Sequence, residues 1–423
     1  MNLAVGVILT LTGDWQIKVE ANGVMATVNV AAPDLVRVGD EKISNLPLYN
    51  PQAPEYARGV PLAGVRAEEC SVRYALNPAS LVVHTPSNSL PYSRGKDYEA
   101  DLTWGCVGRL EGGLITADAT VVVSYSYETM RLDSVILTAD NKIVIRKGTP
   151  HVANPQPPAL ASGETRLANI WISARLPKLG EANLFPILET VYPEPAKTSP
   201  TPAEKSIPKT MAKLNAGGKV RILAWGDSVT DGSFLPEPNV NRWQEQFAKR
   251  LRARYPKAEI MLMTEAWGGR NTDSYRAEPP GSLHNYQEKV LNLRPDLIIS
   301  EFVNDAGLDE TGVYQRYGQI QAEFKAIGAE WIILTPHYVR PDWMGLTVEK
   351  GIDEDPRAYV KALRKFTAEN HIAIAEGSLR YGRLWRQGIP HSTLMLNNIN
   401  HPNAFGMKLF ADALMAIFPD PPN

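Results

Sequence analysis

The 423-residue sequence is poor in cysteine and has no strong excess of charge of either sign. Its two cysteines, Cys70 and Cys106, are too few for a disulfide framework or a four-thiolate metal site. They allow one bridge, but we expect two free, partly buried thiols. The net charge of −2 gives no reason to expect a nucleic-acid partner or binding to an anionic membrane.

Long apolar runs are also missing, and no segment approaches the length that spans a bilayer. The first twelve residues are apolar, but they carry no basic region and no small-residue cleavage site, and they continue directly into Asp14 and Trp15. They are predicted to form a first strand rather than a signal peptide. The compartment stays open between the cytoplasm and export by a leader outside this sequence.

Metal-ligand spacing is absent as well. The histidines outside the motifs discussed below are isolated along the chain, and the acidic run Asp353-Glu354-Asp355 is typical of a helix start. We therefore expect no metal and no other cofactor.

The first 190 residues show short alternating runs broken by Gly, Pro, Asn and Asp, which predicts one or more all-β domains. Residues 135–145 form a predicted hairpin around an Asp-Asn turn, because both turn residues tolerate a positive φ. This hairpin, the following glycine-proline loop and a strand at 167–173 weakly resemble β modules of phage tail and virion proteins. The resemblance implies an accessory role in display, carbohydrate binding or oligomerisation.

A proline-rich linker with a short helix is predicted at 191–218. Beyond it, strand-like runs alternate with helical patterns through residue 423, and the first helix carries Trp243, Phe247 and Leu251 at a spacing of four. Another helix is predicted to start at Asp355-Pro356. Five such units predict a three-layer α/β domain with a mainly parallel five-stranded sheet and functional groups at its carboxyl edge. The runs are 220–225, 259–264, 297–303, 331–335 and 372–375.

Ser228 is the most informative residue, because an apolar strand leads directly into the turn Gly226-Asp227-Ser228. A serine exposed at the end of a buried strand is a candidate nucleophile. Three further blocks follow in order, each at a predicted strand end or terminal loop. They are Gly268-Gly269, Asn304-Asp305 and His401-Pro402.

These four blocks resemble the SGNH (GDSL-type) serine hydrolases, which are esterases with a flavodoxin-like fold. The resemblance covers residues 219–423. It implies that Ser228 attacks the ester carbonyl and that His401 accepts and returns the proton. It also implies an oxyanion hole made by the backbone N–H groups of Ser228 and Gly269 and the side-chain amide of Asn304, with Gly268 as an alternative donor to Gly269.

Position 398 departs from the family pattern, which usually has Asp three residues before the histidine. Asn398 supplies an acceptor oxygen but no charge. Three interpretations are open. Asn398 orients His401 as an amide, another acid or a carbonyl takes that role, or the site is weakened.

The loop after the fourth strand should reach the rim of the site, which makes His337, Arg340 and Trp343 candidate substrate contacts, together with Arg270 beside the glycine block. The resemblance implies a carboxylic ester hydrolase acting on acyl esters, and the expected substrates are O-acetyl groups of a saccharide, with the β region holding glycan or forming a homo-oligomer. The alternatives are a lipid or thioester hydrolase, or a catalytically weakened glycan-binding or virion-type structural protein.

Overall fold

The computed structural model describes residues 6–87 and 90–420, so Met1–Val5 of the predicted first strand lie outside the described residues. The chain divides into two compact units. The first comprises Met1–Thr190 and Trp385–Ile399, and the second comprises Val191–Leu384 and Asn400–Asn423. Within the described part of the chain, no helix combines the length and apolar character needed to cross a membrane.

The first unit is built from antiparallel sheets with the strand orders β1-β2-β3, β11-β10-β12-β13, β4-β9-β6 and β5-β8-β7. The strand bounds are β1 Val7–Gly13, β2 Gln16–Ala21, β3 Val24–Asn29, β4 Leu35–Ser44, β5 Val60–Pro61, β6 Val82–His84, β7 Tyr98–Asp101, β8 Cys106–Arg109, β9 Thr120–Glu128, β10 Arg131–Leu137, β11 Ile143–Arg146, β12 Thr165–Ile172 and β13 Leu184–Pro186.

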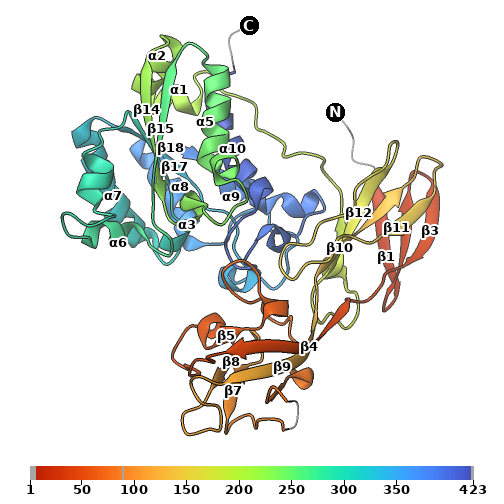
Figure 1. Cartoon of the computed structure of the whole chain (residues 1–423). Coiled ribbons are helices and arrows are strands. Elements are labelled where there is room, and N and C mark those ends of the chain that lie inside the picture. Colours follow the sequence, from red (N-terminus) through yellow and green to blue (C-terminus); the bar gives the residue numbers. More distant parts are fainter. Residues whose placement is uncertain (1–5, 88–89, 421–423) are drawn as a thin grey trace. The chain divides into compact units, whose positions relative to one another are not determined.

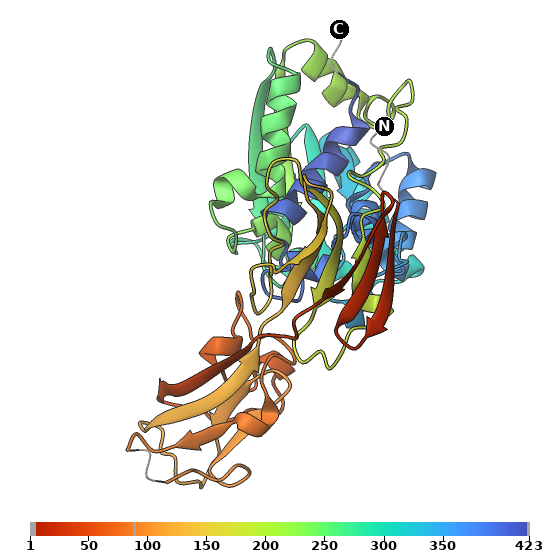
Figure 2. The same ribbon diagram turned by 90° about the vertical axis from the view of Figure 1, so that its right-hand side faces the viewer.

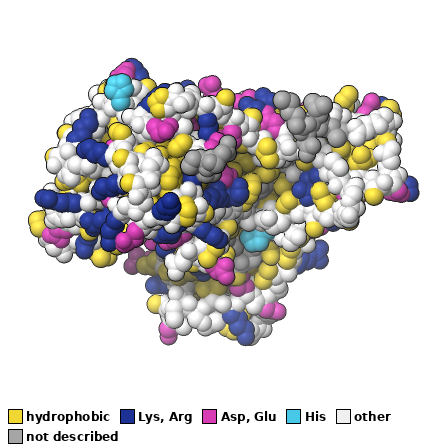
Figure 3. All heavy atoms as spheres, turned by 90° about the horizontal axis from the view of Figure 1, so that it is seen from above, with side chains coloured by type: hydrophobic (Ala, Val, Ile, Leu, Met, Phe, Trp, Pro, Cys, Tyr) yellow, Lys and Arg dark blue, Asp and Glu magenta, His cyan; other side chains and the backbone are white. Residues whose placement is uncertain are grey.

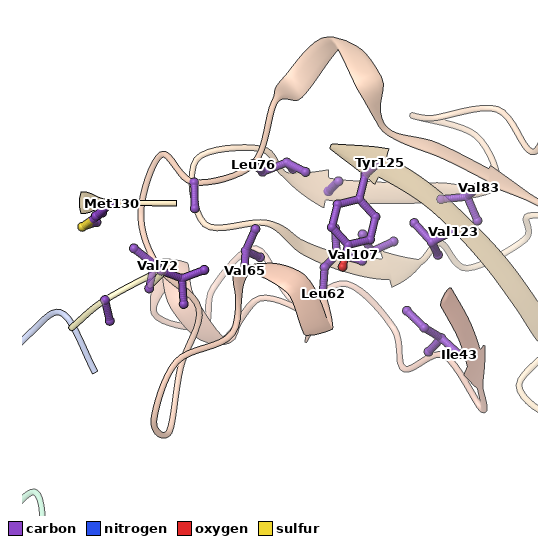
Figure 4. Close-up of a cluster of buried hydrophobic side chains, with 14 of the residues drawn as sticks. Ile43, Leu62, Val65, Val72, Leu76, Val83, Val107, Val123, Tyr125 and Met130 are labelled. Carbon is purple, nitrogen blue, oxygen red and sulfur yellow. The ribbon is translucent and has the colours of Figure 1, made fainter. Parts of the chain in front are cut away.

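Alternation of apolar and polar residues builds two cores in this unit. Ile17, Val19 and Ala21 of β2 are buried and face the apolar side chains of β10 to β13. Figures 1 and 2 both show β1 and β3 lying beside the strands β10 to β12. In the second core the ring of Tyr125 lies among aliphatic side chains of neighbouring strands and loops, as Figure 4 shows.

The predicted hairpin is confirmed, because β10 and β11 pair antiparallel with Leu137 opposite Ile143. Asn141 in its turn has φ 63°. Cys70 and Cys106 are both buried thiols, in agreement with the prediction of two thiols rather than one bridge.

A segment from the C-terminal half, 385–399, packs within the first unit, although the sequence prediction assigned it to the C-terminal domain. The side-chain amide of Asn169 donates to the carbonyl of Gly388 at 2.7 Å, and the Cys70 thiol donates to the carbonyl of Asn397 at 3.5 Å. Ile399 is buried in a small cluster with Cys70, Trp104 and Cys106. These contacts explain why the segment groups with the first unit.

The second unit contains one all-parallel sheet of order β15-β14-β16-β17-β18. Its strands are β14 Lys219–Gly226, β15 Glu259–Ala266, β16 Leu297–Glu301, β17 Glu330–Leu334 and β18 Ala373–Ala375. Its α-helices are α1 Pro202–Ser206, α2 Pro208–Asn215, α3 Ser228–Asp231, α4 Pro238–Asn241, α5 Trp243–Arg254, α6 Thr272–Ala277, α7 Glu310–Ile327, α8 Ala358–Asn370, α9 Gly377–Gly382 and α10 Ala404–Ile417.

Helices cover both faces of this sheet, with α6 and α7 on one side and α5 and α10 on the other, as Figure 1 shows. The interior strand β14 is buried on both faces, since Ile222, Leu223, Ala224 and Trp225 are all 0% exposed. The predicted flavodoxin-like fold with five strands is therefore confirmed, as are the antiparallel β sheets of the N-terminal region.

The helix start predicted at Asp355-Pro356 is wrong by two residues. Helix α8 begins at Ala358, and its N-cap residue Arg357 makes no side-chain capping hydrogen bond. The Asp355 carboxylate instead accepts from the backbone N–H of Arg357 at 3.0 Å and forms an ion pair with its guanidinium at 2.6 Å. The buried ion pair therefore uses the carboxylate that a helix cap would have needed.

Candidate active site

Ser228 is the first residue of the single-turn helix α3, immediately after β14. The turn is tight at Gly226, where a Cβ atom would lie 2.1 Å from Thr230 Oγ1 and 2.4 Å from the carbonyl oxygen of Glu301. Only glycine fits this close approach. Ser228 itself is partly exposed, so the strand end presents its hydroxyl at the carboxyl edge of the sheet.

Asp227 links Ser228 to the Asn304 block. One of its carboxylate oxygens accepts the backbone N–H of Val229 at 3.0 Å. The other accepts both the backbone N–H and the side-chain amide of Asn304, each at 3.0 Å. Because one of the two side-chain N–H bonds of Asn304 is engaged, the rotamer of Asn304 is fixed and the second N–H is available to a ligand.

His401 lies within hydrogen-bond distance of Ser228, with its Nε2 3.2 Å from Ser228 Oγ. His401 is 5% exposed and lies three residues before Ala404, the first residue of α10. The side chain of Asn403 caps α10 by accepting from the N–H of Gly406 at 3.0 Å, which fixes the backbone just after the histidine. The separation of nucleophile and base meets the geometric requirement for proton transfer between them.

The ring of Phe234 stacks on His401, with centroids 4.1 Å apart and an interplanar angle of 6°. Phe234 follows α3 by three residues, so the same short segment carries Ser228 and Phe234, which both contact the imidazole. The sequence analysis did not identify this residue, because nothing in its local pattern relates it to position 401.

The glycine block follows β15. A Cβ atom on Gly268 would lie 3.7 Å from Cβ of Ser228, so this glycine is adjacent to the candidate nucleophile. Gly269 has φ 70°, a conformation that side-chain-bearing residues rarely adopt. The two glycines therefore differ: one lies beside Ser228, and the other makes the backbone turn.

Three acidic residues of the candidate site, Asp227, Asp305 and Glu301, are buried. Burial raises the pKa of Asp227 to about 7, and the hydrogen bonds from Asn304 and Val229 oppose this shift. Burial also raises the pKa of Asp305 to about 6, against the lowering effect of Tyr317 and Thr272, whose hydroxyls donate to it at 2.9 Å each. Glu301 is buried, and among the described residues neither of its carboxyl oxygens has a hydrogen-bond partner. This burial raises the pKa of Glu301 well above its ordinary value.

Asp305 connects two of the blocks, since Thr272 lies just after the glycine block and donates to the residue that follows Asn304. Asp227 and Asp305 thus connect the blocks of the candidate site through hydrogen bonds that the sequence analysis missed. The only available signal was their position beside Ser228 and Asn304 in the motifs.

Asn398 belongs to the first unit and has φ 57°, in the left-handed region that asparagine tolerates. Its side-chain amide donates to the sulfur of Met130 at 4.0 Å, a weak interaction within the same unit. The amide nitrogen is thereby engaged, and the oxygen is the atom relevant to the predicted role as an acceptor.

The predicted substrate contacts differ in their solvent exposure. Arg270 is exposed and lies over the ring of Trp267, and Trp343 is 55% exposed. Arg340 is 7% exposed and forms an ion pair with Asp342. His337 is 0% exposed, and its ring contacts those of Tyr381 and Phe410. A fully buried imidazole belongs to the core packing, so we leave His337 out of the substrate contacts proposed below.

Comparisons with known proteins agree with this arrangement of blocks. Residues 224–409 match the GDSL-like Lipase/Acylhydrolase family. No curated protein sequence matches the chain.

Similar solved structures include a two-domain esterase active on acetylated mannans, at 14% identity and TM-score 0.41, over 52% of this chain and 55% of that one. A catalytic mutant of an acetylxylan esterase from Geobacillus stearothermophilus is 18% identical with TM-score 0.37, over 48% of this chain and 95% of that one. A further acetyl xylan esterase is 18% identical with TM-score 0.36, over 47% of this chain and 98% of that one. The chain thus spans about half of the two-domain esterase, and similarity at this level carries no functional conclusion.

Proposed function

Because residues 224–409 form a GDSL-like lipase/acylhydrolase domain, we propose that the chain is a serine esterase with Ser228 as nucleophile and His401 as general base. The observation that carries this proposal is the 3.2 Å contact between Ser228 Oγ and His401 Nε2 at the carboxyl edge of a parallel sheet.

In the proposed mechanism, the Ser228 oxygen bonds to the ester carbonyl carbon while its proton moves to His401 Nε2. The carbonyl oxygen becomes an oxyanion, which accepts from the side-chain amide of Asn304 and from the backbone N–H groups of Ser228 and Gly269. The imidazolium then returns its proton to the leaving alcohol as the carbon–oxygen bond breaks. Water repeats the sequence on the acyl-enzyme and releases the carboxylic acid.

Asn398 enters this proposal as the residue that orients His401 through its amide oxygen. An amide can hold the tautomer of an imidazole but adds no negative charge. A second acid, or a weakened site, remains the alternative, and replacing Asn398 distinguishes these possibilities.

We propose a short acyl group on a saccharide as the substrate. A cavity of about 540 Å³ in the second unit is lined by residues of 192–202, α9 and α10, and neither Ser228 nor His401 lines it, so it is not an acyl pocket for this nucleophile. Figure 3 shows the side of the second unit that carries α1 and α2, where Lys, Arg, Asp and Glu side chains are all exposed; α3 and Ser228 lie at the other end of the sheet in Figure 1, so this face does not bear on the substrate. Arg270 and Trp343, both exposed, are the proposed saccharide contacts.

The decisive assay compares the chain with Ser228→Ala on p-nitrophenyl acetate and on a panel of acetylated polysaccharides. We expect acetate release by the parent chain and its loss in the variant. Turnover that persists in Ser228→Ala refutes the nucleophile. Turnover of p-nitrophenyl acetate without release from any polysaccharide refutes the saccharide substrate only, and a matching series of longer acyl esters then tests the lipid alternative.

A second candidate function, glycan binding by the first unit, is favoured by a cavity of about 400 Å³ there. Trp15, Asn77, Glu128 and Arg175 are among its lining residues, and this mixture of an aromatic ring with polar groups suits an uncharged sugar. Calorimetric titration of the Ser228→Ala chain with acetylated oligosaccharides tests it, with Trp15→Ala as the paired variant. Equal binding by both proteins counts against this cavity as the binding site.

A further inference from the structure

Phe234 lies against the face of His401, the candidate general base, while Ser228 occupies its edge. The hydrogen bond to Ser228 Oγ at 3.2 Å lies at Nε2 and restrains the ring within its plane. The Phe234 ring is nearly parallel to the imidazole, at 6°, and restrains the ring against tilting. The two contacts are therefore complementary, because each limits a motion that the other allows.

The turn that carries Phe234 is built rigidly. Gly232 ends α3 in the left-handed region with φ 54°, and the N–H of Leu235 donates to its carbonyl at 3.1 Å. The N–H of Ser233 donates to the Asp231 carboxylate at 3.2 Å. Leu235 is 4% exposed and anchors the far side of the turn. The position of the Phe234 ring is thus fixed relative to Ser228 by the backbone that joins them.

We propose that Phe234 is a positioning residue for His401, which fixes the plane of the imidazole and stabilises the imidazolium formed in the transition state. This inference rests on the proposed function. An aromatic ring carries negative charge density on its faces, so a cation against that face is attracted, and more strongly when water is excluded. His401 is 5% exposed, and it gains its positive charge only when the Ser228 proton is transferred. The contact therefore favours the transition state over the resting enzyme.

The test replaces Phe234 by leucine, which keeps an apolar side chain but removes the π face, and by tyrosine, which keeps the face. We expect kcat on p-nitrophenyl acetate to fall about three- to thirtyfold in Phe234→Leu with little change in KM, and to be restored in Phe234→Tyr. Phe405→Leu is the matched control, since Phe405 is 39% exposed and lies in the first turn of α10. This control should leave kcat unchanged.

A spectroscopic measurement makes the inference independent of turnover. The carbon-bound ring protons of His401, assigned by comparison with His401→Gln, lie over the Phe234 ring and are shielded by its ring current. In Phe234→Leu they should move downfield, and in Phe234→Tyr they should stay in place. Unchanged shifts and unchanged kcat in Phe234→Leu overturn the inference.

A loss confined to KM also overturns it, because Phe234 would then be a wall of the substrate site. A chain that is inactive even with Phe234 present contradicts the proposed function, whereas the shielding of His401 would still be measurable. The failure of one proposal is thus distinguished from the failure of the other.

Discussion

Replacing Asp227 by asparagine should misplace Asn304, the proposed oxyanion donor, while the proposed nucleophile Ser228 and base His401 keep their own side chains. In the structure one carboxylate oxygen accepts two N–H groups of Asn304 and the other accepts the N–H of Val229. The variant has one acceptor oxygen and one NH₂ group. Whichever way the amide faces, its donor NH₂ opposes at least one N–H group that was previously paired.

The expected size of the effect follows from the number of N–H groups that lose their acceptor. One buried N–H left without an acceptor costs about 1–3 kcal/mol of stability, so the free energy of unfolding should fall by that amount. If the Asn304 side chain turns away, the catalytic loss approaches that of removing an oxyanion donor, about 3 kcal/mol or a hundredfold in kcat. We therefore expect Asp227→Asn to lower kcat on p-nitrophenyl acetate by about ten- to a hundredfold.

A double-mutant cycle with Asn304→Ala identifies the route of the effect. If Asp227 acts through Asn304, then Asn304→Ala should cost much less in the Asp227→Asn background than in the parent chain. The charge of Asp227 also interacts with His401, and an effect carried by that charge would be independent of Asn304. Additive losses would therefore refute the positioning role of Asp227 and favour the electrostatic one.

Three further predictions concern neighbouring positions. If position 398 orients His401, Asn398→Asp should raise kcat on p-nitrophenyl acetate and Asn398→Ala should lower it. An unchanged kcat in both variants would assign the orienting role to another group. Gly269→Ala should lower the free energy of unfolding in urea by about 1–2 kcal/mol, because Gly269 has a φ of 70°. Gly268→Ala should lower it less, because a Cβ atom there would make only ordinary contacts, and equal losses in the two variants would contradict this difference. The pKa of Asp305 is raised from 3.8 to about 6, so ionisation of this carboxyl should lower the free energy of unfolding as pH rises through this interval. The free energy of unfolding of Asp305→Asn should therefore gain about 2 kcal/mol relative to the parent chain between pH 4 and 6, and urea unfolding curves without this relative gain would refute the raised pKa.

The elements that were predictable from the sequence are those fixed by local pattern. The buried strand runs and the spacing of Trp243, Phe247 and Leu251 indicated the sheet and α5, because burial of those side chains is what the period encodes. The turn at Asn141 was predictable for the same reason, since the residue type determines the backbone conformation that it tolerates.

Features that depend on long-range contacts were not predictable. The carboxylate of Asp355 had the sequence signature of a helix cap, but a buried ion pair with Arg357 uses it, and α8 begins later. His337 followed a strand like a site residue, yet its surroundings bury it. The stack of Phe234 on His401 joins residues far apart in the sequence, and no local pattern encodes such a pair.

The free-energy cost of lacking an acid at position 398 can be compared with the contribution of the Phe234 contact to His401. In a serine protease, exchanging the triad aspartate for asparagine lowers the rate about 10⁴-fold, which corresponds to about 5 kcal/mol. A π face against an imidazolium contributes about 0.5–2 kcal/mol, so Phe234 replaces only part of a missing carboxylate. If no other group contributes, kcat must lie well below that of an enzyme with the acid, and Asn398→Asp must then raise kcat by more than Phe234→Leu lowers it. The ratio of these two effects therefore compares the stabilisation of His401 that an acid at position 398 adds with the stabilisation that Phe234 supplies.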